Sequence, residues 1–169
     1  MKLKVAALIM VAVAVACIIV WLTRSHQSEV LVSPGIALTP QWQEIHLARG
    51  LRTNAAWSEL LLEMPSPQFR QVGGEVLLED GTPFHIDGYL TTDTGEKVNL
   101  DRVGSVSYNG RIFFRLSTAR LEWKQLDYRF PTVALRSDRS LKTGRVIWMS
   151  YDPRATKDGV VFPRTLANR

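Results

Sequence analysis

The feature that most restricts this chain is an uncharged apolar run near its N-terminus, Val5–Leu22, which reads VAALIMVAVAVACIIVWL. The run contains no charged residue, no proline and no glycine. As a helix that rises about 1.5 Å per residue, a run of this length nearly crosses a bilayer core of about 30 Å. It therefore predicts a transmembrane helix within residues 1–24, acting as an uncleaved signal-anchor.

The charges beside this run predict its orientation. Two lysines precede the run and Arg24 follows it, so the positive-inside rule leaves the N-terminus in the cytoplasm. The rest of the chain is then extracytoplasmic, and periplasmic in a bacterial host. Two alternatives stay open: a signal peptide cleaved after Ala14–Ala16, or a lipoprotein acylated at Cys17. The run continues past both sites, which favours the anchor.

The remainder of the chain is long enough for one hydrophobic core. It holds no cysteine after the apolar run, so no internal disulfide stabilises it. Ser, Pro and Gly interrupt any periodicity over residues 25–38, which we interpret as a juxtamembrane linker. Residues 39–169 then form a single extracytoplasmic domain.

The net charge argues against nucleic-acid binding, and the distribution of charge along the chain allows two interpretations. From residue 25 onward 18 basic residues face 16 acidic ones, a balance that argues against a dedicated nucleic-acid binder. Residues 29–101 carry 11 acids and 4 bases, whereas residues 102–169 carry 5 acids and 14 bases. This asymmetry indicates either a charged binding face or two halves whose strands interleave and pair their charges. We favour interleaving.

Short extended runs separated by turn residues predict a mainly β domain, a β-sandwich or a jelly-roll-like fold. Turns are expected at Asp80-Gly81, Thr94-Gly95 and Asn109-Gly110, and the last matches a type I′ hairpin turn. The run Val146–Tyr151 is apolar on both faces, which is typical of a strand at the centre of a sheet.

One or two short helices are expected beside the strands. Thr39-Pro40 resembles a helix start and Gly50 a helix end, so residues 40–49 are predicted to be helical. Residues 55–64 fit helical or strand periodicity, and we favour a strand.

No pattern of catalytic or metal-binding residues stands out. The three histidines are scattered, and no zinc spacing, nucleophile elbow or phosphate loop is present. We therefore predict no cofactor, and an enzyme is the less favoured class. Acids within residues 75–101 raise the possibilities of calcium loops or a glycosidase pair, but their spacing matches neither. We interpret them as solvated turn residues. These acids are Glu75, Glu79, Asp80, Asp87, Asp93, Glu96 and Asp101.

Two groups of residues are candidates for ligand binding. Trp57 and Trp123 can stack on sugar rings if they are exposed, although core packing is the more ordinary role. Strand alternation puts Arg111, Phe113 and Arg115 on one face, where two guanidinium groups around a ring can hold a carboxylate or phosphate. The alternative, which we favour, is that both arginines pair with acids on a neighbouring strand.

These observations favour a membrane-anchored, extracytoplasmic interaction domain that is not catalytic. Its expected partner is an envelope protein, or an anionic glycan at the arginine face. One alternative is a glycan-binding module that uses exposed tryptophans. Another is a membrane-tethered hydrolase that uses acids of residues 75–101. Both alternatives rest on analogy with other β folds.

Overall fold

The computed structural model describes residues 26–53, 57–118 and 129–151, with single positions at 10, 13 and 15. The predicted mainly β domain is confirmed, and from residue 26 onward the described residues contain no helix. The strands are β1 (His26–Val32), β2 (Ala37–Leu38), β3 (Gln43–Arg52), β4 (Trp57–Met64), β5 (Phe69–Val72), β6 (Glu75–Leu78), β7 (Ile86–Thr91), β8 (Lys97–Tyr108), β9 (Arg111–Thr118), β10 (Arg129–Ser137), β11 (Leu141–Lys142) and β12 (Val146–Tyr151).

Most of the predicted anchor, together with Cys17 and Trp123, lies outside the described residues. In the part of the chain that is described, no helix has the length and apolarity needed to cross a membrane.

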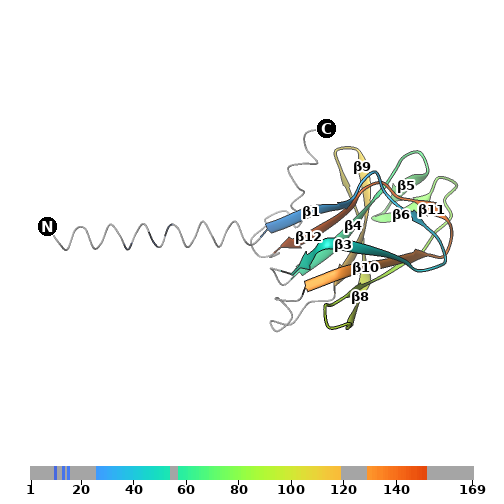
Figure 1. Cartoon of the computed structure of the whole chain (residues 1–169). Helices are drawn as coiled ribbons and strands as arrows, with labels where there is room; N and C mark the ends of the chain where they lie inside the picture. The colour runs from blue at the N-terminus through green and yellow to red at the C-terminus, as the bar shows by residue number, and fades with distance from the viewer. Residues whose placement is uncertain are drawn as a thin grey trace.

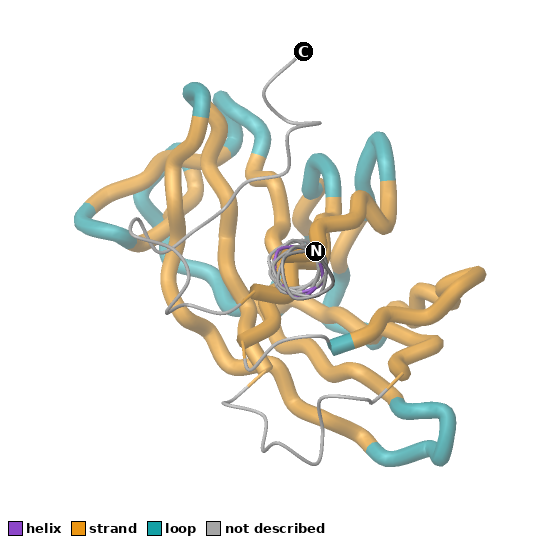
Figure 2. Tube along the Cα trace, turned by 90° about the vertical axis from the view of Figure 1, so that its left-hand side faces the viewer, coloured by secondary structure: helices purple, strands orange, loops and turns teal. Residues whose placement is uncertain are grey.

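The main structural unit is one eight-stranded antiparallel sheet in the order β1-β12-β4-β9-β8-β7-β10-β3 (Figure 1). Its strands curve around a common interior, as Figure 2 shows. Two ribbons of two strands each, β2–β11 and β5–β6, accompany this sheet. The strand order thus differs from the predicted sandwich or jelly roll, in which two large sheets face each other. Here a single sheet encloses most of the core by its own curvature.

Interleaving of the two halves of the chain is confirmed. Late strands lie between early ones, since β12 sits between β1 and β4, and β10 between β7 and β3. Acids from residues 29–101 therefore meet bases from residues 102–169 across strands. These ion pairs are Glu75–Arg102, Glu63–Arg111, Glu59–Arg115, Asp87–Arg136 and Glu63–Arg145.

Strand alternation divides the side chains between the interior and the outer face of the sheet. On β4, Leu60 and Leu62 face the interior, where they meet Phe114 and Leu116 of β9. The β8–β9 hairpin closes at Asn109-Gly110, where both residues have positive φ, 48° and 71°. The predicted type I′ turn is therefore confirmed. It fixes the register of β9 and hence which of its residues point outward.

The helix predicted over residues 40–49 is wrong, because this segment turns and then enters β3. The residues that resembled a helix start do form a capped turn, since Thr39 Oγ1 accepts a hydrogen bond from the Gln41 backbone N–H at 3.3 Å. The turn leads into a strand because Ile45 and Leu47 pack on the core at a spacing of two, while β3 pairs with β10. Gly50, with φ +65°, lies within β3 instead of ending a helix.

Two further expectations change. The segment interpreted as a linker, residues 25–38, contains β1 and β2, so the fold begins at His26. Ser33-Pro34-Gly35 breaks the chain only after β1 has paired with β12. The strand predicted at the sheet centre, β12, is instead second from one edge. It is buried on both faces because separate apolar clusters pack against its two sides.

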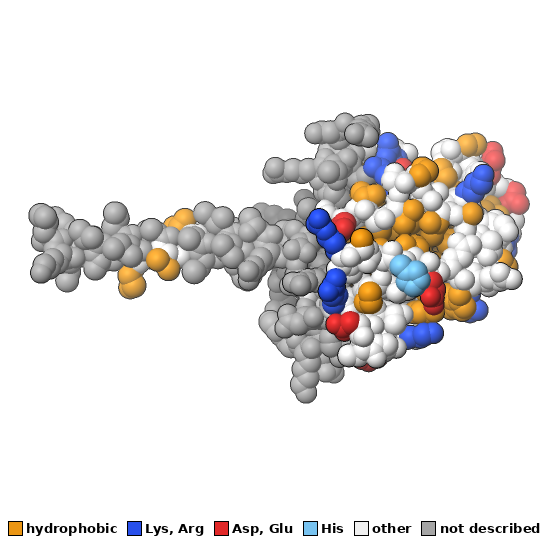
Figure 3. Space-filling view, viewed as in Figure 1, with side chains coloured by type: hydrophobic (Ala, Val, Ile, Leu, Met, Phe, Trp, Pro, Cys, Tyr) orange, Lys and Arg blue, Asp and Glu red, His pale blue; other side chains and the backbone are white. Residues whose placement is uncertain are grey.

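The sheet is not closed, since β1 and β3 form its two edges among the described residues. Half-buried side chains of both edges, Leu31, Val32, Ile45 and Leu47, pack against the same core cluster. Figure 3 shows hydrophobic side chains gathered on the face of the domain that carries the β1 and β3 labels in Figure 1. Part of the core therefore borders on solvent.

Candidate functional site

The predicted arginine face lies on the outer side of β4, β9 and β12, and its charges are internally paired. Arg115 donates from Nε and Nη2 to the two oxygens of Glu59, at 3.0 and 2.6 Å. Glu59 is completely buried and also accepts a hydrogen bond from Trp57 Nε1. A buried carboxylate needs this guanidinium, because an unpaired buried charge costs several kcal/mol.

The second arginine of this face is paired in the same way. Arg111 contacts Glu63 at 3.4 Å, and Arg145, the residue before β12, donates to the same carboxylate at 2.7 Å. Phe113, between the two arginines, is fully buried with Leu61, Ile147 and Met149 in an apolar cluster. The favoured alternative, pairing of both arginines with acids on the adjacent strand, is thus confirmed. The role of these residues in binding an anion stays a prediction.

Of the two candidate tryptophans, the structure describes only Trp57. It is half-buried, packs against the Phe113 cluster and donates to Glu59. Trp123 lies outside the described residues.

The acids of residues 75–101 are dispersed. Glu75 pairs with Arg102, and Asp87 pairs with Arg136 and His85. Within the described part of the chain, no group of three or more His, Cys, Asp or Glu side chains is arranged to hold a metal ion.

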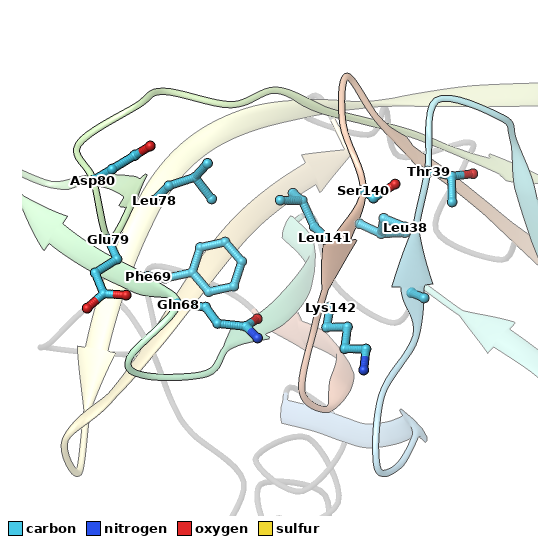
Figure 4. Close-up of a pocket in the computed structure, with 11 residues that line it drawn as sticks. Leu38, Thr39, Gln68, Phe69, Leu78, Glu79, Asp80, Ser140, Leu141 and Lys142 are labelled. Carbon is cyan, nitrogen blue, oxygen red and sulfur yellow. The ribbon is translucent and has the colours of Figure 1, made fainter.

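The strongest candidate site is a cleft of about 760 Å³ between the two ribbons (Figure 4). Two cross-strand apolar pairs form it: Phe69 with Leu78 on the β5–β6 ribbon, and Leu38 with Leu141 on the β2–β11 ribbon. Figure 4 shows Phe69 and Leu141 pointing into the space between the ribbons. A cleft of this size with an apolar floor is typical of ligand-binding sites.

Polar side chains of both charges surround this floor. Gln68, Glu79 and Asp80 contribute from the β5–β6 side, and Ser140 and Lys142 from the other. The Thr82 backbone N–H donates to Asp80 Oδ1 at 2.8 Å, which holds the pKa of this carboxyl below its usual value. Asp80 is therefore ionised at neutral pH. The rim thus presents charged side chains of both signs beside an apolar floor.

Sequence reasoning missed this cleft for a physical reason. The four residues of its two apolar pairs come from four short strands, and Leu38 and Leu141 are more than 100 positions apart. No local spacing marks such a site, because only the pairing of the ribbons brings the side chains together. The one local signal is the turn at Asp80-Gly81. That turn predicts a hairpin with the strand after it, whereas β6 pairs back with β5.

Comparison with known proteins adds no assignment: no protein-family model matches this chain, and a search of curated proteins gave no significant match.

Proposed function

We propose that this chain is a membrane-anchored protein whose extracytoplasmic β domain binds an envelope protein partner in the cleft between its two ribbons. The observation that carries this proposal is the cleft itself, with its apolar floor and charged rim. The anchor in the proposal is the apolar run Val5–Leu22, which ends shortly before β1 begins.

The position of the cleft supports this arrangement. β1 starts at His26, beside the end of β12, and leads toward β2. In Figure 1 the labels β5, β6 and β11 lie at the end of the domain opposite to the start of β1. An anchor that precedes His26 therefore leaves the cleft facing away from the membrane, where a partner can reach it.

The chemistry of the cleft favours a protein segment as the occupant. One large apolar side chain can enter between Phe69 and Leu141, while Glu79 and Lys142 on opposite rims pair with charges beside it. A peptide combines such an apolar anchor with flanking charges in one chain. Because the rim charges are exposed, they contribute selectivity and association rate more than affinity.

A site-specific photo-crosslinking experiment tests this proposal. A photoreactive residue replaces exposed Gln68 at the cleft, or exposed Asn109 at the β8–β9 turn as the matched control. Full-length protein is irradiated in native membranes that have first been washed at alkaline pH, which an anchored chain withstands. We expect a discrete protein adduct from position 68 only, and less of it when Lys142→Glu reverses one rim charge.

Two outcomes contradict the proposal. Equal adducts from positions 68 and 109, or none from either, remove the cleft as the partner site. Release of the protein by the alkaline wash, or a mature N-terminus at Cys17, removes the uncleaved anchor.

A further inference from the structure

A second surface, separate from the cleft, lies on the outer side of β3, β7 and β10. We call it the Trp42 face and define it by Trp42, Glu44, Asp87, Tyr89 and Arg136. The register aligns these residues across strands: Ala134 of β10 is opposite both Glu44 and Tyr89, and Arg136 is opposite Asp87. The small Ala134 between two larger neighbours leaves room for the aromatic rings to lie over the sheet.

The centre of this face is an exposed indole held in place by its neighbours. Trp42 is 41% exposed, the largest exposed ring in the described part of the chain. The ring centroids of Trp42 and Tyr89 lie 4.8 Å apart, and the Arg136 guanidinium carbon lies 4.6 Å from the Trp42 ring centroid. Arg136 is itself fixed by Asp87 at 2.9 Å. The indole is therefore pre-organised, which lowers the entropic cost of binding a ligand.

Polar groups around the indole retain hydrogen-bonding capacity. Among the described residues, Trp42 Nε1 has no hydrogen-bond partner, and Glu44 accepts only a long bond of 3.4 Å from the Tyr89 hydroxyl. Asn99, opposite Tyr89 on β8, is exposed and has no such partner either. The face thus offers both donors and acceptors next to an apolar ring.

The charges of this face restrict the class of ligand. Glu44 and Asp87 are balanced by Arg136 and by Lys97, whose Nζ lies 4.3 Å from the Tyr89 ring centroid. An anionic polymer would meet two carboxylates here, and a cationic one two basic groups. A neutral ligand with many hydroxyl groups meets hydrogen-bond donors and acceptors without a like charge opposite to it.

We infer that the Trp42 face is a carbohydrate-binding site for a neutral glycan chain with equatorial hydroxyls. Such a sugar has a flat apolar face that stacks on the indole, while its hydroxyls bond to Glu44, Asn99 and Trp42 Nε1. This site differs from the glycan site expected from sequence, because it uses Trp42 in place of Trp57 and Trp123. It does not depend on the protein partner proposed for the cleft.

Calorimetric titration of the full-length protein in detergent micelles tests this inference. The probes are cellohexaose and xylohexaose as neutral chains, and a galacturonic acid hexamer as the anionic comparison. We expect a neutral chain to bind, and Trp42→Ala to weaken its binding by about tenfold or more. Val72→Ala, which truncates another exposed apolar side chain, on β5, is the matched control and leaves the affinity unchanged.

Further measurements separate binding from folding. Trp42→Ala is expected to keep the melting temperature of the wild type within a few degrees, because the indole is exposed. Glu44→Gln keeps the size of the side chain and is expected to weaken binding severalfold. The inference is overturned if the wild type binds neither of the two neutral chains. Equal affinity of the Trp42→Ala variant, or preferential, salt-sensitive binding of the anionic hexamer, also overturns it.

Discussion

The two halves of the sheet's outer face carry similar side chains in opposite environments. On β4, β9 and β12, Arg115 pairs with the fully buried Glu59, and the buried Phe113 lies two positions before Arg115 on β9. At β3, β7 and β10, Arg136 pairs with Asp87 and lies over the ring of Trp42, the residue before β3, and all three keep exposed area. Arginine, ring and carboxylate thus occur together in both halves. In the buried half they stabilise the fold, whereas in the exposed half they remain accessible to a ligand.

This difference shows that burial, more than residue type, decides the role of such a cluster. The alternation of Arg111, Phe113 and Arg115 suggested a ligand site, yet each arginine already contacts a glutamate of β4. Arg136 also has an acidic partner, but that pair is about a third or more exposed on both sides and so is screened by solvent. An arginine–carboxylate pair therefore contributes more to the unfolding free energy in the buried half than in the exposed half.

The largest expected effect comes from removing the matched arginine in each half. Arg115→Ala leaves the buried Glu59 carboxylate without its bidentate partner, so we expect a loss of about 3–5 kcal/mol of unfolding free energy. Arg136→Ala removes an exposed pair and is expected to cost less than about 1 kcal/mol. Urea unfolding of the full chain in detergent micelles, followed by tryptophan fluorescence, measures both.

Equal costs for the two substitutions would break the comparison between the halves. A small cost for both would mean that the ion pair of Arg115 with Glu59 contributes little to the stability of the fold.

A smaller effect is expected at the β8–β9 turn. In the sheet, β8 lies between β9 of the buried half and β7 of the exposed half. Gly110 has φ +71°, and a Cβ there would meet no atom within 4 Å. Gly110→Val therefore isolates the backbone cost of positive φ for a β-branched residue, about 1–3 kcal/mol. Gly110→Asn, which tolerates this conformation better, is the control. An unchanged melting temperature for the valine variant would exclude a type I′ turn.

The smallest effect concerns an exposed carboxylate, in contrast to buried Glu59. The Thr82 N–H lowers the pKa of Asp80, so the folded state favours the ionised form. Its contribution is present above the unfolded pKa, about 4, and is lost as pH falls through the lower folded value. The difference in unfolding free energy between wild type and Asp80→Asn should therefore shrink below about pH 4. A difference that stays constant from about pH 7 to pH 2 contradicts this assignment.

Local chemistry was predictable from the sequence where a turn depends on two adjacent residues. Asn109-Gly110 forms the expected hairpin turn because positive φ is a property of those residues. The same local logic failed at Thr39-Pro40. The Thr39 hydroxyl caps a turn as it would cap a helix, and the pairing of β3 with β10 makes the next segment a strand.

The candidate sites were less predictable, because each depends on which strands become neighbours. Trp42 resembled the other tryptophans in sequence, and its exposure results from its place just before an edge strand, β3. Leu38 and Leu141 line one cleft only because β2 pairs with β11. The sequence could nevertheless indicate that acidic and basic halves would pair, since charge balance constrains pairing before the strand order is known.

Because β12 pairs with β1, the first strand of the sheet is synthesised long before the strand that completes its pairing. In the described sheet β1 pairs only with β12, which is synthesised more than 100 residues later. At ordinary rates of translation the edge of β1 then waits on the order of ten seconds for its partner strand. During this interval the run Val30–Val32 presents unpaired backbone and apolar side chains. An unpaired apolar edge of this kind is prone to associate with other chains, so β1 is most exposed to aggregation while Val146–Tyr151 is still being made.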